Sequence, residues 1–452
     1  MEIIKENKMG TMKIPKLLFS ISVPIIISML VQALYNIVDS IFVAQYDNIA
    51  GTGALTLAFP IQTLMIAVAT GLGVGMNALL SRSLGQKNKE KGDLVAGQGI
   101  FLTACGYLIF LLFGFFLVKP FVAVSADKVS TLYQYSVDYI STVTVFSIGI
   151  FIQVTCERLL QATGKSVLSM ITQLSGAIVN IILDPIFIFG FFGVPEMGIK
   201  GAAIATVIGQ AVSAVMGIIF NLTKNPEITL KLKNFLPNLR ILGEMLVIAI
   251  PSIVMQAIGS LMTFSMNNIL LKFSESALNV FGIYFKLQSF IFMPIFGLTN
   301  GMIPIIAFNY GAQKKERVYS TMKLSAVSAV AYMLVGFTAF QTVPEFLLGF
   351  FNASQDMIAV GVPALRIISI SFMLAGFSIV CISTCQALGK SIYSLIVSII
   401  RQLVVLIPAA FLLSLAGNVN LVWWAFPIAE VFGCASCIIF VTRVLRSAFK
   451  TD

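Results

Sequence analysis

The sequence predicts an all-α polytopic membrane protein with twelve transmembrane helices in two six-helix lobes. The chain is 58% hydrophobic and only 11% charged over 452 residues, whereas soluble domains carry roughly a quarter charged residues. Apolar stretches of about twenty residues, the length that spans a bilayer, recur almost from end to end. Three short motifs also occur twice in the same order, which indicates a duplicated half.

Two sets of six spans follow from the apolar stretches and the charge, Gly, Pro and Asn clusters that separate them. Helices are required because hydrocarbon cannot satisfy backbone N–H and C=O groups, and the short alternating segments of a membrane barrel are absent. The expected helices lie near 18–44, 53–80, 95–118, 134–160, 167–192 and 201–222, and near 242–271, 278–309, 321–342, 360–386, 391–415 and 421–445.

The chain is expected to divide at a polar, basic stretch between the two sets of helices. An N-lobe, 17–222, precedes a cytoplasmic interlobe loop, 223–240, and a C-lobe, 241–446, follows it. Short cytoplasmic tails, 1–16 and 447–452, flank the lobes. Six is an even number of spans, so both lobes would share one topology and be related by a pseudo-two-fold axis along the membrane normal.

The distribution of basic residues predicts the orientation of the chain. Most of the 29 Lys and Arg residues fall in loops on the side of the N-terminus, and the opposite loops hold only Lys119, Lys128, Lys200 and Lys272. The excess of positive charge marks the cytoplasmic side, so both termini are expected there. As a separate expectation, the protein is placed in the plasma membrane of a bacterium. The net charge of +10 is explained by this topology and does not indicate nucleic-acid binding.

The repeated motifs lie at nearly one offset. ISVP at Ile21–Pro24 matches IAIP at Ile248–Pro251 at an offset of 227, and QATGKS at Gln161–Ser166 matches QALGKS at Gln386–Ser391 at an offset of 225. Between them, at an offset of 226, Gly71, Gly75, Met76 and Gly85 match Gly297, Gly301, Met302 and Gly311. Gly-Lys-Ser also ends a phosphate-binding loop, which requires a further glycine five positions before the Gly-Lys pair. Leu159 and Thr384 stand there. We therefore interpret the motif as a turn between helices that is duplicated with its lobe.

Longer motifs resemble the multidrug and toxic compound extrusion (MATE) family, in particular its prokaryotic branch related to the DNA-damage-inducible transporters. They are YNIVDSIFVAQ from Tyr35, GLGVGMNALLSRSLGQKN from Gly71, QATGKSVLS from Gln161, NIILDPIFIFG from Asn180 and GIKGAAIATVIGQ from Gly198. The resemblance covers about residues 15 to 446. It implies a secondary transporter, not an enzyme, that exports small amphipathic organic cations by antiport with H+ or Na+. We expect no cofactor other than the coupling ion. We also expect the protein to be a monomer.

Two acids in the apolar spans are the first candidates for an ion site, since a carboxylate at mid-bilayer costs roughly 2.5–3.5 kcal/mol. Asp39 and Asp184 are both predicted in the outer half of the N-lobe. Asn180 lies one turn before Asp184 on the same helix face, and Thr206 is expected at a similar depth. The family resemblance assigns these four residues to a coupling-ion site, with Na+ or H+ as the ion. Solvation of Asp39 at the outer interface, or a kink at Asp184-Pro185, are the alternatives.

The second lobe does not repeat the acidic pair. Met266 aligns with Asp39 and Ala409 aligns with Asp184. Glu430 aligns with Gln210 and is expected to pair with a basic residue that the sequence does not identify. The further candidates for cleft-lining or charge-balancing residues are Tyr35, Asn36, Gln256, Asn267, Lys286 and Arg401.

Other functions fit the sequence less well. A flippase for a lipid-linked sugar precursor is the main alternative, because distant relatives with similar halves have that role. An intramembrane enzyme is not supported, since the chain has no histidine and no convincing nucleophile and base. Cys434 and Cys437 form a Cys-x-x-Cys pattern, but it lies within an apolar span, which disfavours a redox or metal site.

Overall fold

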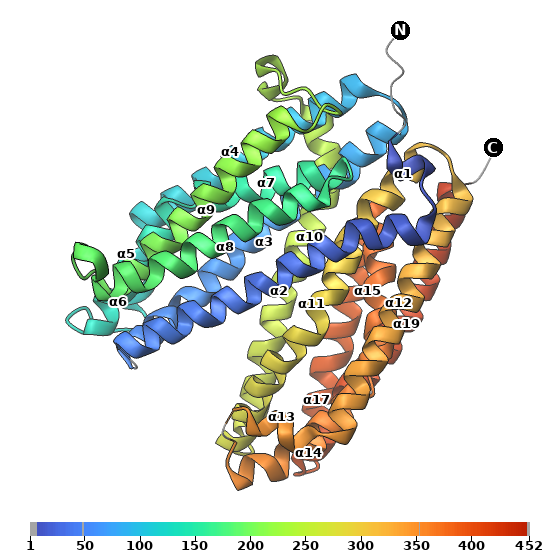
Figure 1. The fold of residues 1–452 in the computed structure, drawn as a ribbon. Helices are drawn as coiled ribbons and strands as arrows, with labels where there is room; N and C mark the ends of the chain where they lie inside the picture. The colour runs from blue at the N-terminus through green and yellow to red at the C-terminus, as the bar shows by residue number, and fades with distance from the viewer. Residues whose placement is uncertain (1–6, 48, 352, 450–452) are drawn as a thin grey trace. The chain divides into compact units, whose positions relative to one another are not determined.

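The computed structural model describes residues 7–47, 49–351 and 353–449. Within these residues the secondary structure is helical and contains no strand, so the predicted all-α membrane fold is confirmed (Figure 1). The outer ends of the two expected tails, 1–6 and 450–452, lie outside the described residues.

The first half of the chain forms nine α-helices and two short 3-10 turns among the described residues. They are α1 (Lys8–Thr11), α2 (Ile14–Tyr46), α3 (Ala50–Gly85), α4 (Lys89–Phe116), α5 (Val118–Ala123), α6 (Thr131–Val145), α7 (Ile148–Ala162), α8 (Ser166–Phe189), η1 (Phe191–Gly193), α9 (Gly198–Thr223) and η2 (Leu232–Phe235).

The second half begins with a long helix that contains Pro251, as α2 contains Pro24. Its elements are α10 (Leu239–Leu271), α11 (Glu275–Gly311), α12 (Lys315–Thr342), α13 (Pro344–Gly349), α14 (Gln355–Ser369), α15 (Phe372–Ala387), α16 (Ser391–Ile399), the π-helical segment η3 (Ile400–Leu406), α17 (Ile407–Ser414), α18 (Val419–Val422) and α19 (Ala425–Ala448).

Ten helical segments of the described chain are long and apolar enough to cross a membrane, and the number rises to twelve if each of two bent pairs is one span. The first pair, α6 and α7, bends by 44°, and the second, α14 and α15, bends by 49°. The expected continuous helices at 134–160 and 360–386 are therefore each broken near the middle. The breaks lie at matching places in the two halves.

The chain forms two compact units. One consists of Met1–Ile26 and Ile250–Asp452, and the other of Ile27–Ala249. Two helices, α2 and α10, contribute to both units, because the chain changes unit two residues after Pro24 and one residue before Pro251. The assignment of transport lobes to 17–222 and 241–446 stays a prediction.

The two Gly-Lys-Ser motifs have the same backbone geometry. Gly164 and Gly389 have φ angles of 80° and 77°, in the left-handed region that glycine adopts without strain. The Lys165 amide donates to the Leu160 carbonyl at 2.7 Å, and the Lys390 amide donates to the Cys385 carbonyl at 2.8 Å. This pattern ends a helix, so both motifs are interhelical turns.

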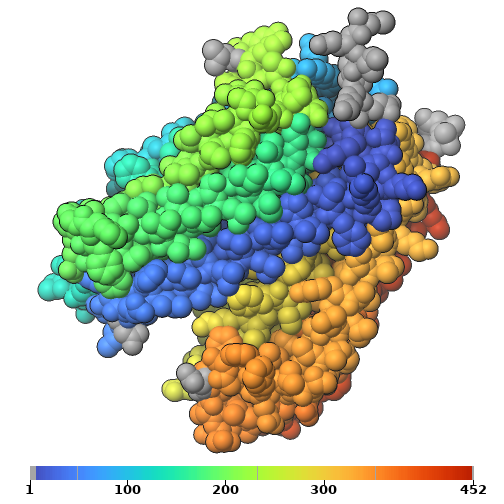
Figure 2. Space-filling view, viewed as in Figure 1, coloured from blue at the N-terminus to red at the C-terminus, as the bar shows by residue number. Residues whose placement is uncertain are grey.

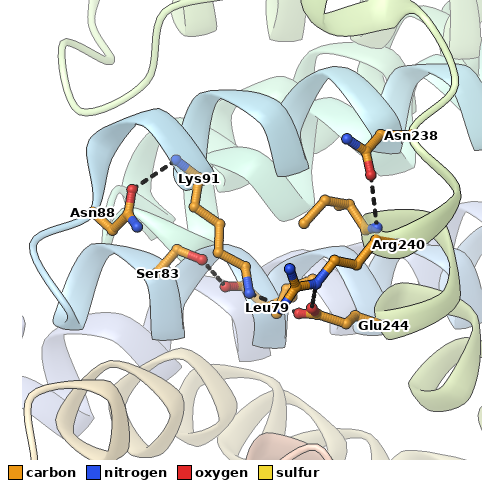
Figure 3. A network of polar contacts seen from close by, with 8 residues as sticks. Leu79, Ser83, Asn88, Lys91, Asn238, Arg240 and Glu244 are labelled. Carbon is orange, nitrogen blue, oxygen red and sulfur yellow. Dashed lines mark hydrogen bonds and ion pairs between the residues drawn. The ribbon is translucent and has the colours of Figure 1, made fainter.

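The segment between the two sets of helices is bound to α4. The Gln98 amide donates to the carbonyls of Asn234 and Leu236 at 2.7 Å each, and its oxygen accepts from the Asn238 amide at 2.8 Å. The Thr229 amide donates to Asp93 at 2.7 Å. In the polar network of Figure 3, α4 also contacts the start of α10, which fixes the end of this segment.

Candidate ion-binding site

The candidate site lies where α8 and α9 run side by side (Figure 1). Two glycines allow this close packing, because a Cβ atom on Gly209 would lie 2.7 Å from the Gly176 carbonyl oxygen and 3.0 Å from the Asn180 Cβ. The short distance between the helices brings polar side chains of α8 within reach of α9.

Asn180 joins three of the four predicted residues. Its amide nitrogen lies 3.3 Å from the Asp184 Oδ1 atom and 3.4 Å from the Thr206 hydroxyl, as a hydrogen-bond donor to each. Asp184 is fully buried, and Asn180 and Thr206 are 3% and 8% exposed. The spacing of four residues between Asn180 and Asp184 places both on one face of α8, as expected for a helix.

Asp39 reaches the same region from α2. Its side chain is buried, with 8% exposure, so the structure does not support the alternative in which it is solvated at the interface. Its carboxylate is close enough to Asp184 for the two charges to interact. Tyr35 and Tyr139 are both buried near enough to this pair of acids to interact with them electrostatically. The structure thus gathers all four predicted residues in one unit.

Three oxygen atoms of the cluster are buried without a hydrogen-bond partner among the described residues. They are Oδ1 of Asp39, Oδ1 of Asn180 and Oδ2 of Asp184. Buried polar atoms are nearly always paired, so such atoms point to a ligand or an ion. Carboxylate and amide oxygens are hard donors, and an ionised carboxylate can also accept a proton.

A small polar cavity adjoins the cluster. Its volume is about 30 Å³, enough for about one water molecule. Gln173 donates to Gln32 at 2.7 Å across helices that line it. The other polar lining residues are Tyr35, Gln153, Asn180, Thr206, Gln210 and Ser213. Water or an ion of similar size therefore has a place beside Asn180 and Thr206.

The MatE family model matches residues 24–186 and 251–412 of the chain. The chain belongs to the MatE family. The two matches begin at Pro24 and Pro251, the prolines of the repeated motif. Because the protein is a multi-pass membrane transporter of this multidrug-efflux family, the expectation that it is not an enzyme is confirmed.

Known proteins resemble the chain over nearly its whole length. It is 28% identical to the multidrug export protein MepA of Staphylococcus haemolyticus (strain JCSC1435). The 437 matched residues cover 97% of this chain and 95% of that protein. It is 33% identical to the MATE multidrug transporter DinF-BH, whose structure contains a bound ligand, with a TM-score of 0.88 and 98% of each chain covered. An outward-facing multidrug resistance MATE family transporter matches its fold with a TM-score of 0.92, at 23% identity over 100% of both chains.

In this MatE transporter, Arg401 balances a charge within the second half. Its guanidinium donates to Glu430 at 2.9 Å, and the two side chains are 19% and 13% exposed. Arg401 lies in the π-helical segment η3, and its side-chain stem lies against Gly433 of α19. Arg401 is therefore the basic partner of Glu430 that the sequence did not identify.

The remaining predicted candidates are not part of the acid cluster in the structure. Asn36 is exposed on α2, while Gln256, Asn267 and Lys286 belong to the unit that does not contain the cluster. Gln256 and Lys286 are exposed, and Asn267 is half-buried. The Lys286 ammonium lies 5.7 Å from the centre of the Phe351 ring. Their roles in a cleft stay predictions.

Sequence reasoning missed the glutamines of the cavity. Gln153 lines it and donates at 3.0 Å to Glu157, one turn later on α7 and 8% exposed. Gln32 and Gln173 come from two other helices. The available signal was a neutral amide recurring in several apolar spans, but the sequence does not tell which of these amides face one another.

Proposed function

We propose that this transporter exports small amphipathic organic cations by antiport with H+ or Na+, and that Asp39, Asn180, Asp184 and Thr206 bind the coupling ion. The observation that carries the proposal is the pair of buried acids with unpaired oxygen atoms beside a water-sized cavity. The names of the multidrug relatives support the export of drugs.

The charges of the cluster favour a cation. Among the described residues, no Lys or Arg forms an ion pair with Asp39 or Asp184. Two negative charges in an apolar lobe repel each other strongly, because the low dielectric screens them little. A proton or Na+ bound between them would reduce this repulsion, and the oxygens of Asn180 and Thr206 would complete a set of hard donors.

In the proposed cycle, export proceeds by alternating access between the two lobes, and binding of the coupling ion drives it. An amphipathic cation from the cytoplasm is attracted by the free acids, and an external ion that neutralises them weakens this attraction and favours return of the empty carrier. The cycle requires that each ligand bind the inward and outward states with different affinity, since equal affinity shifts no equilibrium. The orientation proposed for it has both termini in the cytoplasm, in the plasma membrane of a bacterium.

Proteoliposomes provide the test. Movement of a fluorescent cationic dye would be measured under a pH gradient and under a Na+ gradient imposed separately. We expect one gradient to drive the dye in wild-type protein, and Asp39→Asn and Asp184→Asn each to abolish the movement. Asp138→Asn is the matched control, because this acid lies exposed on α6 of the same unit, and it should transport like wild type.

Two results would contradict the proposal. Transport that persists in both Asn variants would exclude the acids as the coupling site. No dye movement under either gradient, in vesicles that contain folded protein, would favour the flippase of a lipid-linked sugar precursor. Translocation of a labelled lipid-linked sugar in the same vesicles would then identify that activity.

A further inference from the structure

A groove of about 760 Å³ runs along the exposed face of α12. This volume is within the range of small-molecule sites. The helix lies at the molecular surface, in the orange part of Figure 2. The lining residues are Tyr319, Ser320, Met322, Lys323, Ala326, Val327, Val330, Ala331, Leu334 and, from α15, Phe377.

The opposite face of α12 holds the helix in place. Val318, Thr321, Ser325, Ala329 and Met333 are fully buried, at the three- and four-residue spacing of a helix face. That face packs against α11 and α15. On the groove side, the small side chains of Ser320, Ala326 and Ala331 flank the larger side chains of the same helix that line the groove.

The groove is apolar along most of its length and basic at one end. Val327 is 59% exposed and Leu334 is 48% exposed, although both are aliphatic. At the N-terminal end of α12, Lys323 lines the groove, and Lys315 places its ammonium 6.0 Å from the centre of the Tyr319 ring. A ligand with one anionic end and one long apolar part matches this distribution.

We propose that the groove binds one anionic glycerophospholipid, with its phosphate at Lys323 and an acyl chain along Val327, Val330 and Leu334. The eleven residue steps from Lys323 to Leu334 rise about 16.5 Å along the helix. That is about half of a hydrocarbon core of roughly 30 Å, the depth that one leaflet provides. The lipid belongs to the leaflet at the N-terminal end of α12, and its binding does not depend on the proposed transport cycle.

Charge decides between this lipid and an amphipathic cation, which would offer a similar apolar part. A lysine ammonium at the polar end attracts phosphate and repels a second cation. The long apolar stem of lysine lies on hydrophobic surface while its ammonium stays at the headgroup level, and basic residues there attract anionic lipids. Glu316 is exposed and precedes the groove without lining it.

Native mass spectrometry of the delipidated full-length protein can test the groove. Phosphatidylglycerol and phosphatidylcholine with the same acyl chains would be titrated separately. We expect phosphatidylglycerol to bind first and more tightly, and Lys323→Ala to reduce that preference by about fivefold, the effect of one basic residue at an anionic membrane surface. Val330→Trp, which fills the groove, should weaken the binding of both lipids.

Matched variants separate this site from general lipid contact. Lys16→Ala removes an exposed lysine near the start of α2, and Leu108→Trp enlarges an apolar residue that is 51% exposed on α4. Lys16→Ala should leave the preference unchanged, and Leu108→Trp should leave the affinity for both lipids unchanged. Equal binding of the two lipids by wild type, an unchanged preference in Lys323→Ala, or an unchanged affinity for both lipids in Val330→Trp would overturn the proposal. Binding of a cationic dye to wild type that is lost in Val330→Trp, together with no such loss of phosphatidylglycerol binding, would also overturn it. That result would assign the groove to an amphipathic cation.

Discussion

The two halves of the transporter use corresponding positions in opposite ways. In the first half, Gly176 of α8 faces Ser213 of α9, and the space beside them is the water-sized cavity. In the second half, the residue aligned with Gly176 is Arg401, and its stem lies against Gly433, the residue aligned with Ser213. The large and small partners have changed sides, and an arginine side chain extends where the first half has glycine.

Charge follows the same division. In the first half, Asp39 and Asp184 of the buried cluster form no ion pair with a described Lys or Arg, whereas the Glu430 carboxylate of the second half is paired with Arg401 at 2.9 Å. The positions aligned with Asp39 and Asp184 hold Met266 and Ala409. A duplicated bundle can therefore keep an acidic cluster in one copy and a neutral ion pair in the other. The π-helical turns around Arg401, a feature frequent at functional sites, accompany this difference.

The largest effect on stability is expected when the ion pair of the second half is broken. Arg401→Met leaves the Glu430 carboxylate buried and unpaired, which typically costs about 3–5 kcal/mol. A fall in the thermal unfolding midpoint of the detergent-purified protein would measure it. The double variant Arg401→Met/Glu430→Leu should recover most of the loss, because replacing both charges by apolar groups is often neutral. A double variant as unstable as the single one would show that the charges are not coupled.

A smaller effect is expected where the first half depends on glycine. Gly209→Ala adds a methyl group 2.7 Å from the Gly176 carbonyl oxygen, and such overpacking costs about 1–3 kcal/mol. It should also separate Asn180 from Thr206, so binding of the coupling ion should weaken. Thermal unfolding and ion-driven dye transport would measure the two effects. Gly243→Ala on α10 meets no atom within 4 Å and is the control. Equal effects of the two variants would show that the packing of α8 on α9 is not the cause.

The acid cluster should behave in the opposite way to the ion pair. Asp184→Asn removes a buried charge and keeps the shape of the side chain, so we expect stability to rise by about 1 kcal/mol, as is common when a functional site is relaxed. Ion-driven transport should be lost at the same time. The unfolding midpoint and the dye assay can be run on one preparation. A strongly destabilised Asp184→Asn would instead show that the acid has a structural role, such as the proline kink.

Much of this comparison was accessible from the sequence, because its physical causes are local. Burying a carboxylate in an apolar span costs free energy, so Asp39 and Asp184 could be identified as candidate site residues. The helix period then placed Asn180 on the same helix face as Asp184. The family and the membrane fold were confirmed. The roles of the four residues in ion binding stay a prediction.

The remaining features depend on contacts between helices. The breaks between α6 and α7 and between α14 and α15 lie at Ser147 and Ser371. Serine also occurs inside unbroken helices, such as Ser28 in α2, so it does not predict a bend. Arg401 aligns with Gly176 and Glu430 aligns with Gln210, and glycine and glutamine carry no charge, so alignment of the halves did not indicate the ion pair. The cavity is made by glutamines of separate helices, and hydropathy does not define which way each one faces.

The smallest effect on stability is expected for an ion pair outside the buried clusters. Breaking this pair tests whether burial is the reason that Arg401 contributes more to stability than other basic residues do. Lys91 of α4 lies 2.7 Å from Glu244 of α10, with side-chain exposures of 29% and 35%, and Arg240 lies 3.8 Å from the same acid (Figure 3). Because solvent screens such pairs, Lys91→Gln should cost about 0.5 kcal/mol. Raising the salt concentration should shrink the difference from wild type, while the loss in Arg401→Met should persist. A salt-insensitive loss of several kcal/mol at Lys91 would instead mean that the contact between α4 and α10 depends on this charge.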